Sequence, residues 1–278
     1  MPPFEKLPKD QVKVTSSTVM NNLQGKRLWL IGASTGIGRD LALLLAKEGV
    51  AVVISARNEG ALQSLIQEMK PVETELGSHS LVVYDVKKMD MAKGAFEAAG
   101  ELDGIIYCAG AYEPMTAHKP NLVALEEMVE INYCGAFRVL AEIVPRFVQR
   151  KSGYILLIGS ISGYRGLPNA WGYGATKAAL MHLAENLKCD LMGSGVRIQI
   201  CNLGFVETRL TDKNNFKMPF IMDTKSAAQR IVKGMKSKRF EIAFPLIMVL
   251  ALKFLALLPR PLYFTVISLM GNKSDRNS

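Results

Sequence analysis

Short apolar runs alternate with amphipathic stretches along most of the chain. Runs with the length and composition of buried strands lie at 27–31, 50–55, 80–84, 104–108, 154–158 and 196–201. Stretches with apolar residues at helical spacing lie at 39–48, 59–69, 90–99, 122–149 and 171–192. Alternating strands and helices predict parallel βαβ units, so we expect an α/β fold: a doubly wound parallel sheet with helices on both faces. A ligand crevice is expected at the carboxyl ends of its strands.

The two ends of the chain depart from this pattern. Residues 1–25 carry mixed charge and lack the apolar segment of a secretory signal, so we interpret them as an N-terminal arm before a catalytic domain at 26–240. Residues 241–278 form a C-terminal extension in which two long stretches are almost wholly apolar. Because Lys253 and several prolines interrupt these stretches, we expect a cap, a subunit interface or a peripheral membrane contact, not a membrane-crossing helix.

The amino-acid composition and the net charge limit the classes of function that this chain can have. The 278 residues are 49% hydrophobic and 21% charged, which describes a globular chain with enough apolar material for one large core. The net charge of +9 suits general solubility, attraction to a phosphorylated cofactor or attraction to anionic lipid. The basic residues are scattered, so no nucleic-acid partner is expected. Four cysteines in apolar surroundings, without metal-ligand spacing, predict core positions, no metal site and a cytoplasmic location, with association at a membrane surface left open.

A glycine-rich loop follows the first expected strand. The sequence Gly32-Ala33-Ser34-Thr35-Gly36-Ile37-Gly38 connects the run at 27–31 to the helical stretch at 39–48. Glycines allow a tight turn and close approach of the backbone to a ligand, and the amides at a helix N-terminus attract phosphate. In this strand-to-helix context, the loop predicts a dinucleotide site formed by Gly32, Ser34, Thr35, Gly36, Ile37 and Gly38.

A candidate acid–base pair lies on the stretch 171–192. Tyr173 and Lys177 are four residues apart, so a helix places both on one face, where a cation lowers the pKa of the phenol. Tyr173 could then act as a general acid or base, and Ser160, just after the run 154–158, could hydrogen-bond the substrate oxygen. Such pairs also arise by chance as ordinary surface contacts, so this one gains weight only beside the glycine loop.

In their order and spacing, these motifs resemble those of the short-chain dehydrogenase/reductase family over residues 26–238. The family's glycine motif is matched by Gly32, Gly36 and Gly38, and its catalytic serine, tyrosine and lysine by Ser160, Tyr173 and Lys177. Asn132 falls where the family has its catalytic asparagine, which implies a water-mediated proton relay from Lys177. Departures from the family pattern occur at Ile31, Tyr107, Cys108 and Leu203.

The resemblance also implies cofactor contacts. The family's contacts to adenine, to the ribose and to the nicotinamide carboxamide are matched by Asp85 and Val86, by Ala109 and Gly110, and by Val206 and Thr208. After the second expected strand, Ala56 stands where an NAD-selective protein usually has an acidic residue, and Arg57 and Asn58 follow it. The guanidinium of Arg57 suits a 2′-phosphate, so we expect NADP(H); the alternative is that Arg57 is an ordinary exposed arginine.

Together these features predict an oxidoreductase that interconverts a hydroxyl and a carbonyl with NADP(H). Apolar residues near the site and in the segment 209–223, which has the composition of a mobile lid, favour a small apolar or lipid-like carbonyl or alcohol substrate. Two alternatives remain: a non-catalytic NADP(H)-binding regulator, and an epimerase or dehydratase that uses the same Tyr–Lys pair. The resemblance further implies a homo-oligomer through the helices that carry Asn132 and Tyr173.

Overall fold

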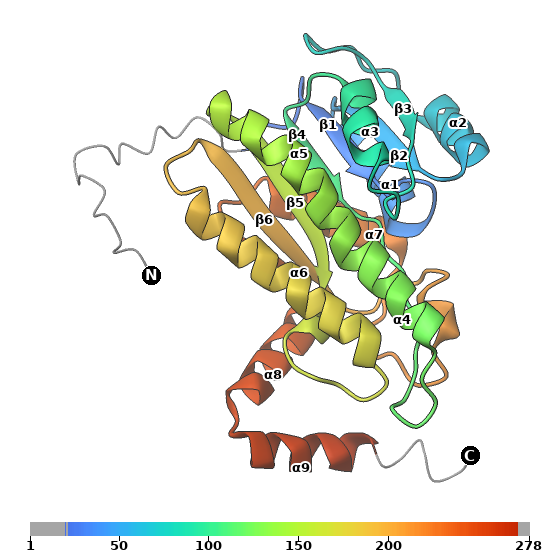
Figure 1. The fold of residues 1–278 in the computed structure, drawn as a ribbon, viewed down its shortest axis with the longest axis vertical. Helices are drawn as coiled ribbons and strands as arrows, with labels where there is room; N and C mark the ends of the chain where they lie inside the picture. The colour runs from blue at the N-terminus through green and yellow to red at the C-terminus, as the bar shows by residue number, and fades with distance from the viewer. Residues whose placement is uncertain (1–19, 21, 272–278) are drawn as a thin grey trace.

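The computed structural model describes residues 20 and 22–271, and the strands in this part of the chain form one parallel sheet (Figure 1). The strands are β1 Arg27–Ile31, β2 Ala51–Ala56, β3 Ser80–Val83, β4 Gly104–Tyr107, β5 Gly153–Ser160, β6 Val196–Leu203 and β7 Glu241–Phe244. Their order in the sheet is β3-β2-β1-β4-β5-β6-β7. Strands β2 and β3 are added on one side of β1, and strands β4 to β7 on the other, so the strand order switches direction between β1 and β4. Ligands bind at such a switch point in doubly wound sheets.

Helices cover both faces of the sheet (Figure 1). One face carries α1 Gly36–Lys47, α2 Glu59–Glu68 and α7 Thr224–Met235. The other carries α3 Met91–Ala99, α4 Leu122–Val129, α5 Gly135–Gln149 and α6 Trp171–Asp190. Successive residues of β1 contribute to opposite cores, Leu28 and Leu30 to one and Trp29 and Ile31 to the other. A strand buried on both faces therefore reads as an uninterrupted apolar run.

The expected helix at 122–149 is divided into three parts. Between α4 and α5 the residues Glu130–Cys134 form a π-helical turn, η3. A π turn holds one residue more than an α turn, so the buried faces of α4 and α5 are out of phase with each other. Asn132, which is fully buried, lies inside this turn.

The predicted doubly wound α/β fold is confirmed, with the ends of the expected elements shifted by a few residues. The helix α7 and the strand β7 were not expected. Since β7 pairs with β6 and lies inside the range 241–278, the sheet continues into the segment that we assigned to the extension. Of the four cysteines expected in the core, Cys201 is buried, Cys108 and Cys134 are half-buried, and Cys189 is exposed. The N-terminal arm at 1–25 lies almost entirely outside the described residues.

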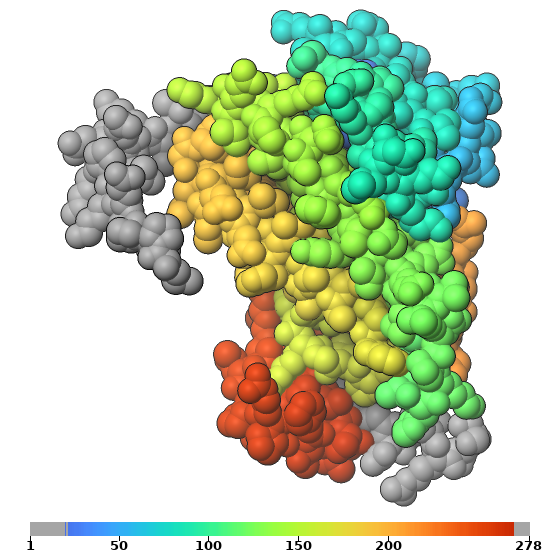
Figure 2. Space-filling view, viewed as in Figure 1, coloured from blue at the N-terminus to red at the C-terminus, as the bar shows by residue number. Residues whose placement is uncertain are grey.

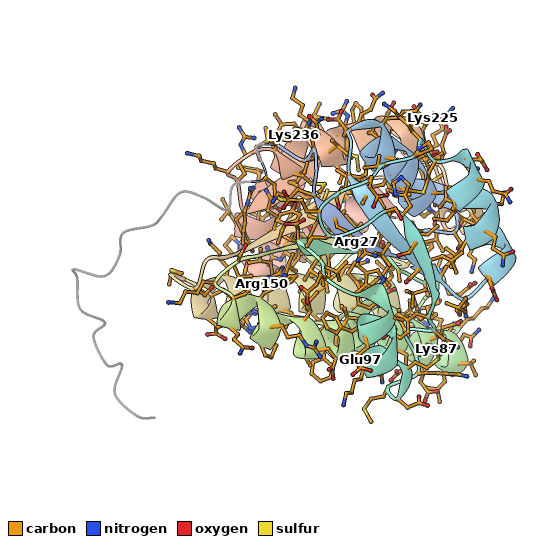
Figure 3. All side chains as sticks on the ribbon, turned by 90° about the horizontal axis from the view of Figure 1, so that it is seen from above. Arg27, Lys87, Glu97, Arg150, Lys225 and Lys236 are labelled. Atoms are coloured by element: carbon orange, nitrogen blue, oxygen red, sulfur yellow. The ribbon has the colours of Figure 1, made fainter. Side chains whose placement is uncertain are left out.

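Charged side chains lie around the periphery of the molecule. Figure 3 shows this for Lys87, Glu97, Arg150, Lys225 and Lys236. Arg27 is an exception at 8% exposure, because its guanidinium donates to the backbone carbonyl oxygens of Ala99 and Glu101 at 2.6 and 2.8 Å. The buried cation thereby fixes the chain between α3 and β4.

The C-terminal helix pair consists of α8 Leu246–Leu257 and α9 Arg260–Gly271, and it lies at one end of the molecule (Figure 1). The loop between β5 and α6 holds it in place. Arg165 donates from Nη1 to the backbone carbonyls that end α8, those of Leu255, Ala256 and Leu258, at 2.8 to 3.0 Å. The Tyr263 hydroxyl on α9 donates to the carbonyl of Gly166 at 2.5 Å. No helix within the described ranges has the length and apolar character needed to cross a membrane.

Candidate active site

One large cleft crosses the carboxyl edge of the sheet. Its volume of about 2150 Å³ exceeds the roughly 300–1,000 Å³ of ordinary ligand pockets, so it has room for a dinucleotide and a second ligand together. One end lies at the glycine loop between β1 and α1. The other end is lined by apolar side chains of α8, namely Ile247, Met248, Ala251, Leu252 and Leu255.

All the predicted site residues except Asn132 line this cleft. They are Gly32, Ser34, Thr35, Gly36, Ile37, Gly38, Arg57, Asn58, Asp85, Val86, Ala109, Gly110, Ser160, Tyr173, Lys177, Val206 and Thr208. Asn132 lies behind the wall, where its amide nitrogen donates to the Ala111 carbonyl and to the Thr176 hydroxyl, both at 3.0 Å. A Cβ built on Gly110 would lie 3.6 Å from Asn132 Oδ1 and 4.0 Å from Lys177 Nζ. Asn132 therefore borders the lysine site from inside the protein.

The glycine loop is shaped for close approach by a phosphate. Gly32 has a φ of +93°, and a Cβ there would lie 2.5 Å from the backbone nitrogen of Ala109, so no other residue fits without strain. The first turn of α1 carries no acidic residue. The Thr35 hydroxyl, at the N-cap, accepts a hydrogen bond from Arg209 at 2.9 Å. The positive end of α1 and this neighbouring guanidinium suit a pyrophosphate.

Three arginines line the cofactor end of the cleft, and only Arg57 among them was predicted. Arg39 and Arg209 directly follow two predicted residues, Gly38 and Thr208, so their place beside the motifs was the available signal. Arg39 forms an ion pair with Glu68, and the charged atoms are 2.5 Å apart. The side chain of Arg57 is exposed. Next to Arg57, the side chain of Asn58 caps α2 by accepting a hydrogen bond from the Ala61 amide at 2.9 Å.

The candidate catalytic side chains face one another across the cleft. Ser160 ends β5, and its Oγ accepts hydrogen bonds from the amide and the hydroxyl of Ser162 at 3.2 and 3.0 Å. Lys177 donates from Nζ to the Ile158 carbonyl at 2.9 Å, and Nζ lies 5.6 Å from the centroid of the Tyr173 ring. One strand end and one face of α6 thus supply a hydroxyl, a phenol and an amine to the same space.

Burial controls the protonation of the Tyr–Lys pair. It raises the pKa of Tyr173 to about 12, and the Ser160 side chain opposes this shift only in part. Burial lowers the pKa of Lys177 to about 8. We expected Lys177 to lower the pKa of Tyr173, and this is not found. The cost of burying a phenolate outweighs other effects, and the lysine directs its hydrogen bond to the Ile158 carbonyl instead.

Tyr112 is a site residue that the sequence analysis missed. Its ring packs edge-on against Tyr173, with centroids 4.9 Å apart and an interplanar angle of 77°. The Tyr112 hydroxyl donates to Asn214 Oδ1 at 2.6 Å, and its backbone carbonyl accepts a hydrogen bond from Lys213 at 3.0 Å. Tyr112 therefore joins the Tyr173 ring to the segment 209–223. Its position just after the end of β4 was the only signal in the sequence.

A parallel doubly wound sheet with a glycine-rich loop and a Tyr–Lys pair at its carboxyl edge is typical of nucleotide-dependent oxidoreductases. The family model described as short chain dehydrogenase matches residues 26–218. The chain belongs to the short-chain dehydrogenase family.

Relatives agree with this assignment. An uncharacterized oxidoreductase of Myxococcus xanthus is 34% identical over 239 residues, covering 84% of this chain and 92% of that protein. A 3-oxoacyl-[acyl-carrier-protein] reductase of Thermotoga maritima is 26% identical over 222 residues, covering 80% of this chain and 88% of the relative. The crystal structure of a short chain dehydrogenase from Burkholderia cenocepacia in complex with NADP has a TM-score of 0.75 at 18% identity, covering 88% of this chain and 98% of that one. This last match shows likeness of fold.

Proposed function

We propose that this protein reduces carbonyl groups on apolar or lipid-like substrates with NADPH, and oxidises the matching alcohols in the reverse direction. The observation that carries the proposal is the continuity of the cleft. Tyr173 and Lys177 lie in the same cleft as the glycine loop and the apolar face of α8. The Thermotoga maritima relative, whose name specifies a 3-oxoacyl group, supports a carbonyl on an acyl chain as the substrate class.

The residues at the cofactor end fit NADP(H). When bound, the cofactor would supply the hydride for the substrate carbon. The backbone of Gly32–Gly38 would hold the pyrophosphate, and Arg57, with no acidic residue at the end of β2, would bind the 2′-phosphate. The remaining contacts would come from Asp85 and Val86 to adenine, Ala109 and Gly110 to ribose, and Val206 and Thr208 to the carboxamide.

The protein's own contribution to catalysis is proton handling and orientation. Because its pKa is raised to about 12, Tyr173 is in its acid form at neutral pH and donates its proton to the substrate oxygen during reduction. Ser160 hydrogen-bonds to that oxygen. Lys177, with a pKa lowered to about 8, exchanges protons readily near neutrality and returns one to Tyr173. Asn132, fixed between Ala111 and Thr176, holds the wall behind Lys177.

An assay of NADPH consumption tests this proposal. The purified chain is incubated with NADPH, or with NADH, and with short ketones, long-chain 3-oxoacyl thioesters or sugar nucleotides. We expect turnover with carbonyl compounds, faster with long apolar ones and with NADPH. Tight NADPH binding without turnover on any carbonyl would support a regulator, and an isomerised sugar nucleotide without net NADPH loss would support an epimerase. Either result would overturn the proposal.

A further inference from the structure

We propose that the C-terminal helix pair docks on an anionic lipid bilayer, and that the substrate cleft opens onto this docking surface. The inference rests on the proposed function for the nature of the substrate. Bilayer binding itself is a separate property, and it is measurable without any turnover.

The helix α8 has two apolar faces. Met248, Leu252 and Leu255 line the cleft. On the outer side, side chains at helical spacing are exposed to 63%, 58%, 66% and 83%, namely Leu246, Leu250, Phe254 and Leu257. The helix α9 adds exposed side chains at 51%, 61% and 70%, namely Leu262, Phe264 and Leu269. An exposed apolar face of this kind on α8, with further exposed apolar side chains on α9, marks a site of contact with a protein or a membrane.

The charged side chain inside α8 and the carbonyls that end this helix are paired on the protein side. Lys253, the one charged residue inside α8, forms an ion pair with Glu241 on β7. The other oxygen of Glu241 accepts hydrogen bonds from Tyr164 and Asn202 at 2.5 and 2.7 Å. The carbonyls that end α8 are satisfied by Arg165, as described above. These contacts fix the cleft-lining face of α8 and leave apolar side chains on the outer face.

The position of the cleft mouth distinguishes a bilayer from a second copy of the chain. Ile247 and Ala251 line the cleft and are also exposed, Ile247 to 59%, so the cleft opens beside the outer face of α8. Phe220, which also lines the cleft, is 56% exposed. A second copy seated on this face would cover the mouth and exclude the substrate. A bilayer in the same place would deliver an apolar substrate directly into the cleft.

The charge of the C-terminal helix pair and the length of its two helices favour a bilayer surface as the docking partner. Residues 242–271 contain no acidic residue, and Lys253 is paired with Glu241, so the cations that would meet anionic headgroups are Arg260 of the helix pair and the exposed Lys217, which lines the cleft. Each helix has 12 residues and measures about 18 Å, which suits a helix lying in the interface. In Figure 2 the pair forms a projecting lobe at one end of the molecule.

Flotation with lipid vesicles tests the docking surface. The full chain is mixed with vesicles of phosphatidylcholine and phosphatidylglycerol, or of phosphatidylcholine alone. The test variant carries Leu250→Gln, Phe254→Gln and Leu257→Gln, none of which lines the cleft. The matched control carries the same change at three exposed apolar residues elsewhere, Met89→Gln, Val123→Gln and Met192→Gln. We expect the test variant to lose at least about tenfold in partitioning to the mixed vesicles, and the control to bind like the native chain.

A second measurement separates this inference from the proposed function. Reduction of a short water-soluble ketone should be equal in the native chain and the test variant, while reduction of a long-chain ketone embedded in mixed vesicles should fall in the variant alone. A native chain that stays unbound with mixed vesicles, or that forms a dimer which the test variant abolishes, would overturn the docking surface. Vesicle binding without reduction of any carbonyl would leave the docking surface standing and overturn the proposed function.

Discussion

Lys177 is buried and Tyr173 is half-buried, and desolvation shifts the pKa values of the two side chains in opposite directions. The pKa of the phenol rises to about 12 and that of the amine falls to about 8, so the interval between them widens. At neutral pH the phenol keeps its proton, and the lysine is close to its own midpoint. This state favours proton donation, and we therefore place the reductive direction first.

Replacing Tyr173 with Phe removes the transferable proton and keeps the ring that packs on Tyr112. Since general acid catalysis contributes about 10² to 10⁴ in rate, we expect kcat for carbonyl reduction to fall by at least about a hundredfold. The dissociation constant of NADPH should change little, as measured by fluorescence titration. Tyr112→Phe is the matched control, because it loses only the hydrogen bond to Asn214 and should retain most activity. Near-native turnover in Tyr173→Phe would show that another group is the acid.

The lowered pKa of Lys177 predicts how reduction depends on pH. In the proposed mechanism, the ammonium form, which dominates below its pKa of about 8, returns protons to Tyr173. Above that pH the amine loses its charge, so kcat/KM for the carbonyl at saturating NADPH should be level at lower pH and decline as pH rises through about 8. Initial rates across a pH series provide the measurement. A profile that rises through this range would contradict the assignment.

In the proposed function, Arg57 is the residue that selects NADPH over NADH. Removing its guanidinium in Arg57→Ala should weaken NADPH binding by about 1.5 to 3 kcal/mol, the range for a hydrogen bond to a charged group, and leave NADH binding nearly unchanged. Isothermal titration with both cofactors measures the difference. Lys225→Ala, an exposed cation that does not line the cleft, controls for net charge. Equal losses of affinity for both cofactors would contradict the assignment of the 2′-phosphate to Arg57 and make Arg39 the next residue to test.

At the scale of elements, the repeated pattern of strands and helices was predicted from the sequence, whereas features that occur once in the fold were not. The alternation of apolar runs and amphipathic stretches was sufficient to predict the strands β1 to β6, because strands buried on both faces are apolar throughout. The strand β7 was missed because its four residues lead into the apolar helix α8, with no change of period visible between them. The π turn at Glu130–Cys134 was missed because one extra residue leaves composition unchanged.

In the candidate site, too, residues that belong to a sequence pattern were predicted and residues outside any pattern were missed. The residues on motifs, such as Gly32 and Tyr173, were predicted because backbone geometry or chemistry requires those residue types. Tyr112 and Arg209 lie on loops, and loops have no periodicity from which a contact can be read. Likewise the sequence placed Tyr173 and Lys177 on one helical face but did not show how deeply they are buried, which decides their pKa values.

The loop that carries Arg165 positions the C-terminal helix pair. Arg165→Gln loses the donors to three carbonyls and the stacking on Tyr263, whose ring centroid lies 4.0 Å from the guanidinium carbon. Each broken contact of this type costs about 1 to 3 kcal/mol, so we expect faster amide exchange across residues 246–271 and slower reduction of long apolar substrates. Arg146→Gln on α5, which loses a similar contact with Phe96 on α3, should leave exchange in this segment unchanged.

At the scale of the whole molecule, the strand β7 fixes where the chain can be shortened. Ile242 and Phe244 are 7% and 4% exposed, so a chain ending at Lys238 loses part of the main core, and we expect its free energy of unfolding to drop by at least about 3 kcal/mol. A chain ending at Pro245 keeps the sheet and should lose less. It should still bind NADPH, with activity reduced more on long substrates than on short ones. Urea unfolding and the carbonyl assay compare the two, and equal destabilisation would contradict the role given to β7.

The cleft takes its walls from segments far apart in the chain, from the glycine loop through α6 to α8 and α9. A cofactor bound there contacts only the folded chain, so binding and folding are linked by mass action. At a concentration one hundred times its dissociation constant, such a ligand adds about 2.7 kcal/mol to the free energy of unfolding. In a cell, proteases act on the unfolded fraction, and that fraction shrinks as the cofactor concentration rises. The amount of intact protein would then follow the supply of reduced nicotinamide cofactor, even at a constant rate of synthesis.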